Sequence, residues 1–413
     1  MERRLAITPR LPTLLLMAGL VAAAWRAPRA APPVFVVPPA MTAAERPVAA
    51  IDAFRCVPVP QQEPSAHASS LAMAPDGSTL LAWFSGEREG ASDVSIRMAR
   101  FPAPGQGGAP PVESWISLTR ERLQALTSRV IRKIGNPVLW FDGGGHLHMH
   151  VVSVSYGGWS GSAINQLVSD DEGRTWSSAK RLILSPFFNF STLVRTQPQI
   201  LQDGSIGLPA YHEFVQKWGV WARLDESGSL LQMASMQRYE GNWLQPAVVA
   251  TSPTEAVAAL RAGSHSPRRI GRSATADGGA SWPLRPDDSI IDIPNPDSSM
   301  AMIRLSDGSL LMACNPLEQG RNRIQLLRSE DGGSKWKPSR LIEAGEAGDE
   351  FSYPSLVQDR EGRIHLSYTW KRQAIRLCTF SPAWLEGPAS DAEPAVHADS
   401  AGASVASPSG GAP

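Results

Sequence analysis

An octapeptide that returns at a nearly constant interval places the strongest constraint on the fold of this chain. Residues 169–176 read Ser-Asp-Asp-Glu-Gly-Arg-Thr-Trp, and residues 275–282 and 329–336 repeat its Ser/Thr-x-Asp-x-Gly-x-x-Trp pattern. A degenerate copy covers residues 224–228. The acidic residues of the four copies, at positions 171, 225, 277 and 331, are separated by 54, 52 and 54 residues. A repeat of this length indicates a series of similar supersecondary units.

The residue types of the octet predict a tight turn that is held against a sheet. The side chain of Asp171 can accept hydrogen bonds from backbone amides a few residues on, and Gly173 tolerates a positive φ angle. Trp176 is a large apolar side chain that can fix the turn by packing. We therefore expect Asp171 to stabilise a turn rather than to act as a catalyst.

A second repeat accompanies the octets and predicts the number of units. Each unit contains an apolar run, a turn and another apolar run, as in a β-hairpin. The six turns lie at Asp76-Gly77, Asp142-Gly143, Asp203-Gly204, Thr254-Glu255, Asp307-Gly308 and Glu361-Gly362. Their spacing of roughly 50–65 residues matches one four-stranded propeller blade. We predict an all-β, six-bladed β-propeller, because a β-helix has a much shorter period and a sandwich has none. Each octet falls later in its unit, where the outer hairpin should turn.

The composition of the ends differs from that of the repeats. Three arginines precede Leu11–Trp25, an uncharged run of 15 residues, so we predict that residues 1–30 form a signal peptide or an N-terminal membrane anchor. Export to the periplasm, the cell exterior or the membrane surface follows from this. Residues 31–60, rich in Pro and Ala, are expected to form an extended linker, residues 61–386 the propeller, and residues 387–413 a disordered tail.

Charge and cysteine content exclude several kinds of partner. Lys plus Arg and Asp plus Glu both number 39, so the net charge gives no sign of a nucleic-acid partner. Three widely spaced cysteines form no metal motif. One disulfide is possible, but the sequence favours Cys56, Cys314 and Cys378 as buried apolar fillers. We expect a monomer without a cofactor or metal.

Equivalent positions of all blades converge on the axis of a propeller, so the repeat predicts which residues meet. The position before each first strand is occupied by His67, Asn136, Gln197, Gln245, Ser298 or Ser299, and Tyr353. The position after each second strand is occupied by Arg88, Tyr156, His212 with Glu213, Arg261, Asn315 and Arg372. We expect a polar axial pocket, and arginines there would suit an anionic small molecule. Proline follows four residues of the first set, which predicts extended backbone at those four.

On these residues the chain resembles the sialidase (neuraminidase) superfamily, and within it the predicted bacterial exo-α-sialidases with Asp-box repeats. The resemblance covers most of residues 65–380 and includes His67-Ala68-Ser69-Ser70-Leu71, Arg88-Glu89-Gly90 with Asp93-Val94, Leu244-Gln245-Pro246, Glu350-Phe351-Ser352-Tyr353-Pro354 and Tyr368-Thr369-Trp370-Lys371-Arg372. It implies a tyrosine nucleophile partnered by a glutamate, an aspartate acid/base and three arginines that bind the carboxylate of the sugar.

Carried over by position, the resemblance assigns roles to particular residues. Tyr353 matches the nucleophile, and either Asp93 or Glu89 the acid/base. Arg261 and Arg321 match two carboxylate-binding arginines, with Arg323 as a rival to Arg321, and Arg88 matches an accessory arginine. Arg372 is a further arginine expected at the mouth.

Two positions depart from the pattern of the family. His67 stands where the first arginine is expected, and Gln245 stands where the glutamate partner is expected. An amide cannot take a proton from the phenol, so Glu213 is an alternative base. Protonated His67 would strengthen carboxylate binding at lower pH.

The resulting prediction is an exported sialidase-type glycosidase that cleaves a terminal acidic sugar, sialic acid or a similar one, from a glycoconjugate. The two departures leave a non-catalytic sugar-binding propeller or a glycosidase for another acidic sugar as alternatives. A scaffold at the cell envelope is a third possibility, supported only by the ends of the chain.

Overall fold

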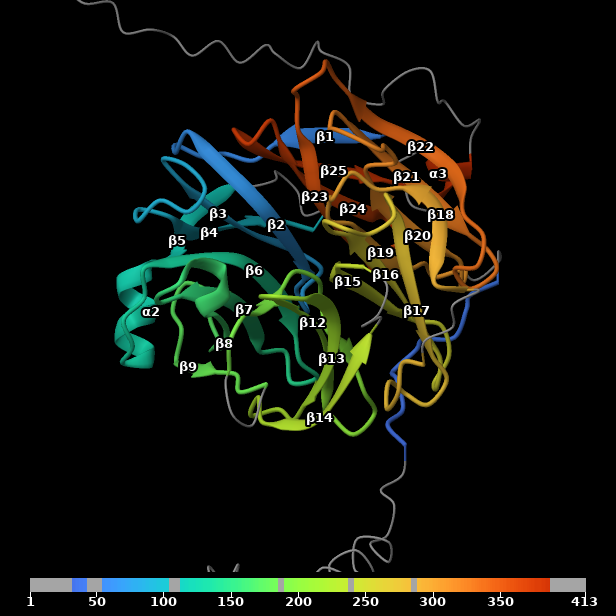
Figure 1. Cartoon of the computed structure of the whole chain (residues 1–413). Coiled ribbons are helices and arrows are strands. Elements are labelled where there is room, and N and C mark those ends of the chain that lie inside the picture. Colours follow the sequence, from blue (N-terminus) through green and yellow to red (C-terminus); the bar gives the residue numbers. More distant parts are fainter. Residues whose placement is uncertain are drawn as a thin grey trace, which may run out of the picture. The chain divides into compact units, whose positions relative to one another are not determined.

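Six antiparallel sheets, one for each predicted hairpin, contain all the strands that the structure describes (Figure 1). In the computed structural model, the described residues are 32–42, 54–103, 112–184, 189–236, 241–283 and 288–386. They belong to the unit Pro33–Pro413, apart from Pro32 at the end of the unit Met1–Pro32. The predicted signal or anchor (1–30) and the predicted tail (387–413) lie outside the described residues. The sheets form a six-bladed β-propeller, which confirms the predicted fold class.

Blades 1 to 3 follow one another along the chain. Blade 1 contains β2 (Ser65–Met73), β3 (Thr79–Gly86), β4 (Ser95–Phe101) and β5 (Glu113–Leu118). Helix α2 (Arg120–Thr127) leads to blade 2, with β6 (Lys133–Phe141), β7 (Leu147–Val154), the 3-10 turn η1 (Gly158–Gly161), β8 (Ser162–Ser169) and β9 (Ser178–Arg181). Blade 3 contains β12 (Ile206–Glu213), β13 (Lys217–Leu224) and β14 (Leu230–Met236), and its innermost strand is split into β10 (Thr192–Val194) and β11 (Gln199–Ile200).

Blades 4 to 6 complete the ring. Blade 4 contains β15 (Trp243–Ala250), β16 (Ala256–Ala262), β17 (Arg269–Thr275) and β18 (Ile290–Pro294). Blade 5 contains β19 (Ala301–Arg304), β20 (Leu310–Cys314), β21 (Arg323–Ser329) and β22 (Lys337–Ala344). Blade 6 contains β23 (Phe351–Gln358), β24 (Ile364–Trp370) and β25 (Ala374–Phe380), followed by helix α3 (Pro382–Glu386). Its outermost strand is β1 (Arg55–Pro58), from the N-terminal side of the propeller.

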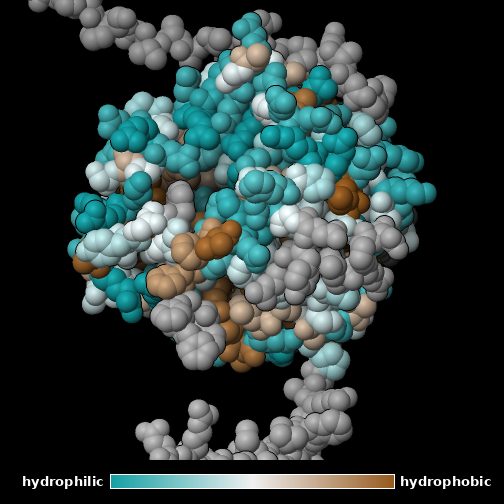
Figure 2. All heavy atoms as spheres, in the orientation of Figure 1, coloured by the Kyte–Doolittle hydropathy of each residue, from teal (hydrophilic) through white to brown (hydrophobic). Residues whose placement is uncertain are grey.

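The position of a strand within its blade explains its sequence pattern. Strands β3 and β7 are buried at every residue, because neighbouring blades cover both of their faces. Strand β3 is apolar over Leu80–Phe84, whereas β7 also buries polar side chains, those of His148, His150 and Ser153. The outer strand β14 alternates between exposed and partly buried residues. The face of the molecule drawn in Figure 2 is mostly hydrophilic, with hydrophobic residues only in small groups, as is usual for a surface in water.

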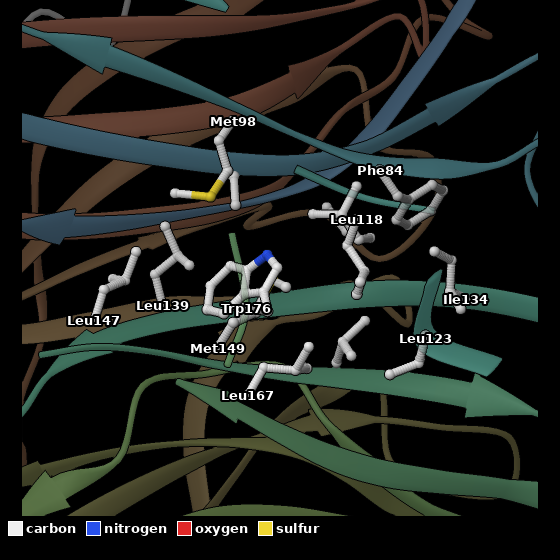
Figure 3. Packing of buried hydrophobic residues seen from close by; sticks show 14 of the residues in the cluster. Phe84, Met98, Leu118, Leu123, Ile134, Leu139, Leu147, Met149, Leu167 and Trp176 are labelled. Atoms are coloured by element: carbon white, nitrogen blue, oxygen red, sulfur yellow. The ribbon is translucent and has the colours of Figure 1, made fainter. Parts of the chain in front are cut away.

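The octets occupy the turns between the third and fourth strands, as predicted. In the first of them, Asp171 Oδ1 accepts from the amide of Thr175 at 2.7 Å, and Ser169 Oγ accepts from the amide of Gly173 at 2.8 Å. Trp176 is inserted between blade 2 and the preceding blade, among Met98 and Leu118 of blade 1 (Figure 3). Its indole Nε1 donates to the carbonyl of Ser117 at 3.2 Å. The octet therefore fixes an outer turn and fastens one blade to the next.

A disulfide closes the ring between the first and last strands. Cys56 of β1 lies directly opposite Cys378 of β25, and the two are bonded across a sequence separation of 322 residues. Cys314 is a buried free thiol. The prediction that all three cysteines are buried apolar fillers was wrong for Cys56 and Cys378. Their pairing depends on β1 joining blade 6, the blade farthest from it in sequence.

Residues 33–41, within the segment predicted to be an extended linker, contact several blades. Phe35 forms an isolated β-bridge with Leu201 of blade 3 and is fully buried in an edge-to-face contact with Trp221. The amide of Met41 donates to the carbonyl of Ser306 in blade 5 at 2.7 Å. This segment lines an axial cavity of about 570 Å³ and so forms a strap across several blades.

Candidate active site

Bulges in the innermost strands position the residues of the first predicted set. The pairing register shifts in β2, β6, β15 and β23 near their starts. A non-glycine residue with positive φ lies at each shift: Ala68 (55°), Asn136 (48°), Gln245 (46°) and Tyr353 (53°). The last three precede proline, so the prediction of extended backbone was wrong at these positions. Left-handed backbone at residues with a side chain is strained, and it is common at functional sites.

Tyr353 is the centre of a hydrogen-bonded group on the propeller axis. Its hydroxyl accepts from Nη1 of Arg261 at 3.0 Å, and the same nitrogen donates to Oε1 of Gln245, also at 3.0 Å. Gln245 is buried, and its Nε2 donates to the hydroxyl of Tyr211 at 3.3 Å. Nε of Arg261 pairs with Asp297 at 2.6 Å. Blades 4 and 6 thus bring three of the predicted residues, Tyr353, Arg261 and Gln245, together, and blade 3 adds Tyr211.

Three guanidinium groups surround the ring of Tyr353. The Cζ atoms of Arg195, Arg321 and Arg261 lie 5.2, 5.7 and 6.0 Å from the ring centroid. Burial raises the pKa of Tyr353, but the positive charges of Arg261 and Arg321 outweigh it and hold that pKa below its usual value. A phenol in this environment loses its proton more readily than a free tyrosine does.

Glu350 connects two further predicted arginines. Arg321 Nη1 donates to it at 3.1 Å and Arg372 Nε at 2.7 Å. Burial raises the pKa of Glu350, while the hydrogen bonds from Arg372 and Ser352 and the charge of Arg321 lower it to about 2. The amide of Phe351 donates to the carbonyl of Arg321 at 2.8 Å, so backbone pairing places Arg321 beside Glu350. Its rival Arg323 begins β21, where its carbonyl accepts from Asn315 Nδ2.

His67 packs against the ring of Tyr353, with centroids 4.3 Å apart. It is buried, and desolvation together with the nearby charge of Arg372 holds its pKa well below the usual value. His67 is therefore neutral at ordinary pH. Any strengthening of carboxylate binding by protonation of His67 therefore requires a pH well below the usual pKa of histidine.

The remaining predicted residues lie on loops and at strand ends. Asp93 is exposed, and its Oδ2 accepts from the amide of Glu87 at 2.7 Å within the β3–β4 loop. Glu89 of the same loop forms an ion pair with Arg372. Glu213, the alternative base, forms an ion pair with Lys217 at 2.7 Å. A base for Tyr353 would instead be expected to accept a hydrogen bond from the Tyr353 hydroxyl.

Not all members of the second predicted set reach Tyr353. The ring of Tyr156 is 61% exposed and lies against Arg132, and His212 packs against Trp218. Asn315 is buried and donates to the carbonyl of Phe351 at 2.7 Å. The second set therefore divides between the axial site and the loops around it.

The sequence did not indicate Arg195, Asp297 or Glu350 as site residues. Arg195 lies in the break between β10 and β11, two residues before the predicted axial position of blade 3. Asp297 precedes the Ser298 and Ser299 positions of blade 5. Glu350 was part of the segment that carries the family resemblance, but no role was assigned to it. Each lies within three residues of a predicted position, so a wider window around the repeat would have included all three.

Within the described ranges, no group of three or more His, Cys, Asp or Glu side chains is arranged to hold a metal ion. No helix among the described residues is both long and apolar enough to cross a membrane.

Comparison with known proteins identifies relatives of this arrangement. The family model described as "BNR repeat-like domain" matches residues 77–366. No curated protein matches the chain in sequence. The solved structure of the Hadza microbial sialidase Hz136 is 16% identical with a TM-score of 0.61, over 78% of this chain and 66% of that one, so this chain spans just under two thirds of that protein.

Two other solved structures show that the fold has different activities. The intramolecular trans-sialidase from Ruminococcus gnavus, in complex with oseltamivir carboxylate, is 13% identical with a TM-score of 0.60, over 78% of this chain and 96% of that one. The α-L-arabinanase of Penicillium chrysogenum, in complex with arabinobiose, is 12% identical with a TM-score of 0.57, over 78% and 96%. At these identities the likeness establishes the fold, and the site must decide the function.

Proposed function

Because the chain belongs to the BNR repeat-like domain family, we propose that it is an exported glycoside hydrolase of sialidase type, which cleaves a terminal acidic sugar such as sialic acid from glycoconjugates. The observation that carries this proposal is the hydroxyl of Tyr353, which accepts from Arg261 on the propeller axis with three guanidinium groups around its ring. Most glycosidases use a carboxylate as nucleophile, and sialidases use a tyrosine.

Tyr353 is proposed as the nucleophile that attacks the anomeric carbon. In a sugar that carries a carboxylate on this carbon, an anionic carboxylate nucleophile would be repelled, whereas a phenol is not. The arginines lower the pKa of Tyr353, so the phenol releases its proton to solvent more easily as its oxygen bonds to the anomeric carbon. The bond from that carbon to the leaving oxygen breaks in the same step, and the leaving oxygen takes a proton from a general acid. Gln245 holds Arg261 and Tyr211 in position but, as an amide, it does not take this proton.

Arg261 and Arg321 are proposed to bind the carboxylate of the sugar. Guanidinium groups carry five N–H donors each and bind carboxylates through two parallel hydrogen bonds. Among the described residues, Nε and Nη1 of Arg261 already donate hydrogen bonds, and Nη1 and Nη2 of Arg321 donate one each. The remaining N–H groups of both arginines can bind the sugar carboxylate. The pairing with Asp297 and Glu350 holds both guanidinium planes in place before the substrate arrives, which lowers the entropic cost of binding.

The acid that protonates the leaving oxygen is proposed to be Glu89 or Asp93. Both lie on the β3–β4 loop, and Glu89 pairs with Arg372, which also binds Glu350 beside Arg321. Asp93 is exposed and would approach the leaving group from the loop. Separate Glu89→Gln and Asp93→Asn variants distinguish them, since only the true acid should lose the limb of the pH profile that requires a protonated group.

The disulfide supports the export part of the proposal. Stable disulfides form in oxidising compartments, and Cys56–Cys378 links the two ends of the propeller. The uncharged run Leu11–Trp25 provides the expected export signal. Fractionation of cells that express the full chain tests this, and recovery of the protein in the cytoplasm would reject export.

The hydrolytic part is tested with a fluorogenic sialoside from acidic to neutral pH. Wild-type protein should release the fluorophore, and Tyr353→Phe should reduce kcat at least a hundredfold while retaining the fold by circular dichroism. The absence of turnover by the wild type would reject sialidase activity.

A sugar-binding propeller without hydrolysis is the second candidate. It is favoured by Gln245 at the position of the expected glutamate and by the neutral His67. Binding of acidic glycans without release of sugar would support this function over the first.

A further inference from the structure

A second cleft, of about 440 Å³, adjoins the Tyr353 site. It is lined by His67 of blade 1, Arg88 and Glu89 of the β3–β4 loop, Lys133 at the start of β6 and Arg372 at the β24–β25 turn. We call it the basic cleft. His67 also contacts the ring of Tyr353, so a single side chain separates the basic cleft from the proposed nucleophile. Its volume lies in the range of small-molecule sites, roughly 300–1,000 Å³.

The basic cleft carries an excess of positive charge. Three cationic side chains, those of Arg88, Lys133 and Arg372, line it with a single carboxylate, that of Glu89, which is paired with Arg372. The Nζ atom of Lys133 lies close above the loop: a Cβ atom placed on Gly90 would be 3.2 Å from it. Arg372 also binds Glu350 outside the cleft. The charges of Arg88 and Lys133 are therefore available to an anionic ligand.

His67 provides an independent indication of a ligand. It is only 2% exposed, and neither ring nitrogen has a hydrogen-bond partner among the described residues. Leaving a buried polar group without a partner is unfavourable, and native structures contain few such groups. A neutral imidazole offers one donor and one acceptor, so a polar group bound in the cleft would supply the missing partner.

We propose that the basic cleft binds a second anionic group of the substrate, a sulfate ester or a second carboxylate, on the acidic sugar or on the sugar next to it. This rests on the proposed function only in placing the sugar at Tyr353. The carboxylate on the anomeric carbon is assigned to Arg261 and Arg321, neither of which lines the cleft. The substrate class is then a glycan with two negative charges rather than one.

Inorganic sulfate, titrated calorimetrically into the full-length protein at constant ionic strength, tests the cleft without any requirement for catalysis. Sulfate affinity should fall at least tenfold in an Arg88→Gln/Lys133→Gln double variant. An Arg174→Gln/Lys335→Gln double variant makes the same change of charge at two exposed turns and should stay within twofold of the wild type. Equal sulfate affinity in the cleft variant and the wild type, or no saturable binding by the wild type, would overturn the proposal.

Matched glycans identify the anionic group. Bound to the Tyr353→Phe protein, an acidic glycan with a sulfate ester or with a second carboxylate should bind at least tenfold more tightly than its singly charged counterpart, and the cleft variant should lose this difference. Whichever of the sulfated and the dicarboxylate glycans binds more tightly identifies the anionic group that the basic cleft prefers. A preference of this kind without hydrolysis by the wild type would support the cleft while rejecting the proposed reaction. Equal affinity for all three glycans would reject the cleft.

Discussion

Arg195 donates a hydrogen bond to the carbonyl oxygen of Tyr353 at 2.7 Å, across 158 residues of sequence. It also donates to the carbonyls of Pro354 at 3.1 Å and Ser69 at 3.0 Å. One buried guanidinium thus holds the bulges of two inner strands, and its Cζ lies 5.2 Å from the ring of Tyr353. Burial lowers the pKa of Arg195 to about 10, which still leaves it charged at neutral pH. Arg195 is a positioning residue for the proposed nucleophile.

Replacement of Arg195 by Met should destabilise the protein and displace Tyr353. Three buried carbonyls would lose their donor at about 1–3 kcal/mol each, so we expect the free energy of unfolding to fall by about 3 kcal/mol or more. Urea denaturation measures this. The left-handed backbone at Tyr353 would relax, and kcat should fall more than KM changes. Arg174→Met, on an exposed turn, is the control and should change stability by about 0.5 kcal/mol or less. A stable Arg195→Met protein with normal kcat would contradict the positioning role.

The phenol of Tyr353 should ionise below the pH at which free tyrosine does. An alkaline titration followed by phenolate absorbance measures this, and the signal of Tyr353 is the difference between the wild-type and Tyr353→Phe curves. In Arg321→Gln the midpoint should move upward, because one of the charges that favours the phenolate is gone while the effect of burial stays. Tyr156→Phe, which removes an exposed ring, controls for the loss of one chromophore. A Tyr353 midpoint above that of free tyrosine would contradict the electrostatic argument.

Glu350 should contribute to resistance against acid. Its pKa is about 2 in the folded protein and near the ordinary 4.5 when unfolded, so its contribution is complete above pH 4.5 and is lost as the pH falls from 4.5 towards 2. The contribution is on the order of 3 kcal/mol. Glu350→Gln is expected to be less stable at pH 7, and its stability should decrease less between pH 5 and pH 3 than that of the wild type. Equal pH dependence in the two proteins would show that Glu350 is not the responsible group.

The parts of the fold that could be predicted from sequence are those that depend on local chemistry. Turn residues such as Asp76-Gly77 and the octet at 169–176 determine hairpins through hydrogen bonds between residues close in sequence. Hairpin turns of the first kind occur six times along the chain. Their spacing was sufficient to predict the number of blades and to place Tyr353, Gln245 and Arg261 near the axis. The contacts between these three residues confirm that the repeat brings them together.

The parts that could not be predicted depend on contacts between distant segments. Proline normally favours extended backbone in the residue before it, yet Tyr353 and Gln245 adopt left-handed conformations, since the strand bulges there and Arg195 binds the carbonyl of Tyr353. The disulfide partner of Cys56 became apparent only when β1 was seen beside β25. In both cases the decisive neighbour lies more than 150 residues away.

Asp171 should be important for stability and unimportant for activity. Its carboxylate accepts from the amide of Thr175 at 2.7 Å and from the Thr175 hydroxyl at 2.6 Å, on an outer turn of blade 2. Asp171→Ala should therefore lower the free energy of unfolding by about 1–2 kcal/mol. The neighbouring Asp170→Ala, whose side chain is 73% exposed, should change it by about 0.5 kcal/mol or less. Sialoside turnover at saturating substrate should stay within twofold in both, and a large loss in Asp171→Ala would mean that the octet takes part in catalysis.

Reduction of Cys56–Cys378 should destabilise the closed ring. The bond links residues 322 apart, and in the chain-entropy description a loop of this size stabilises the folded state by about 6 kcal/mol. Because β1 has only four residues and pairs with β25 alone, it should be the first strand to detach. Dithiothreitol should therefore lower the Tm of the wild type and of Cys314→Ala equally, and leave Cys56→Ser/Cys378→Ser unchanged. Amide hydrogen exchange should show faster exchange first in Arg55–Pro58 and Ala374–Phe380, and uniform exchange across all blades would contradict closure by this bond.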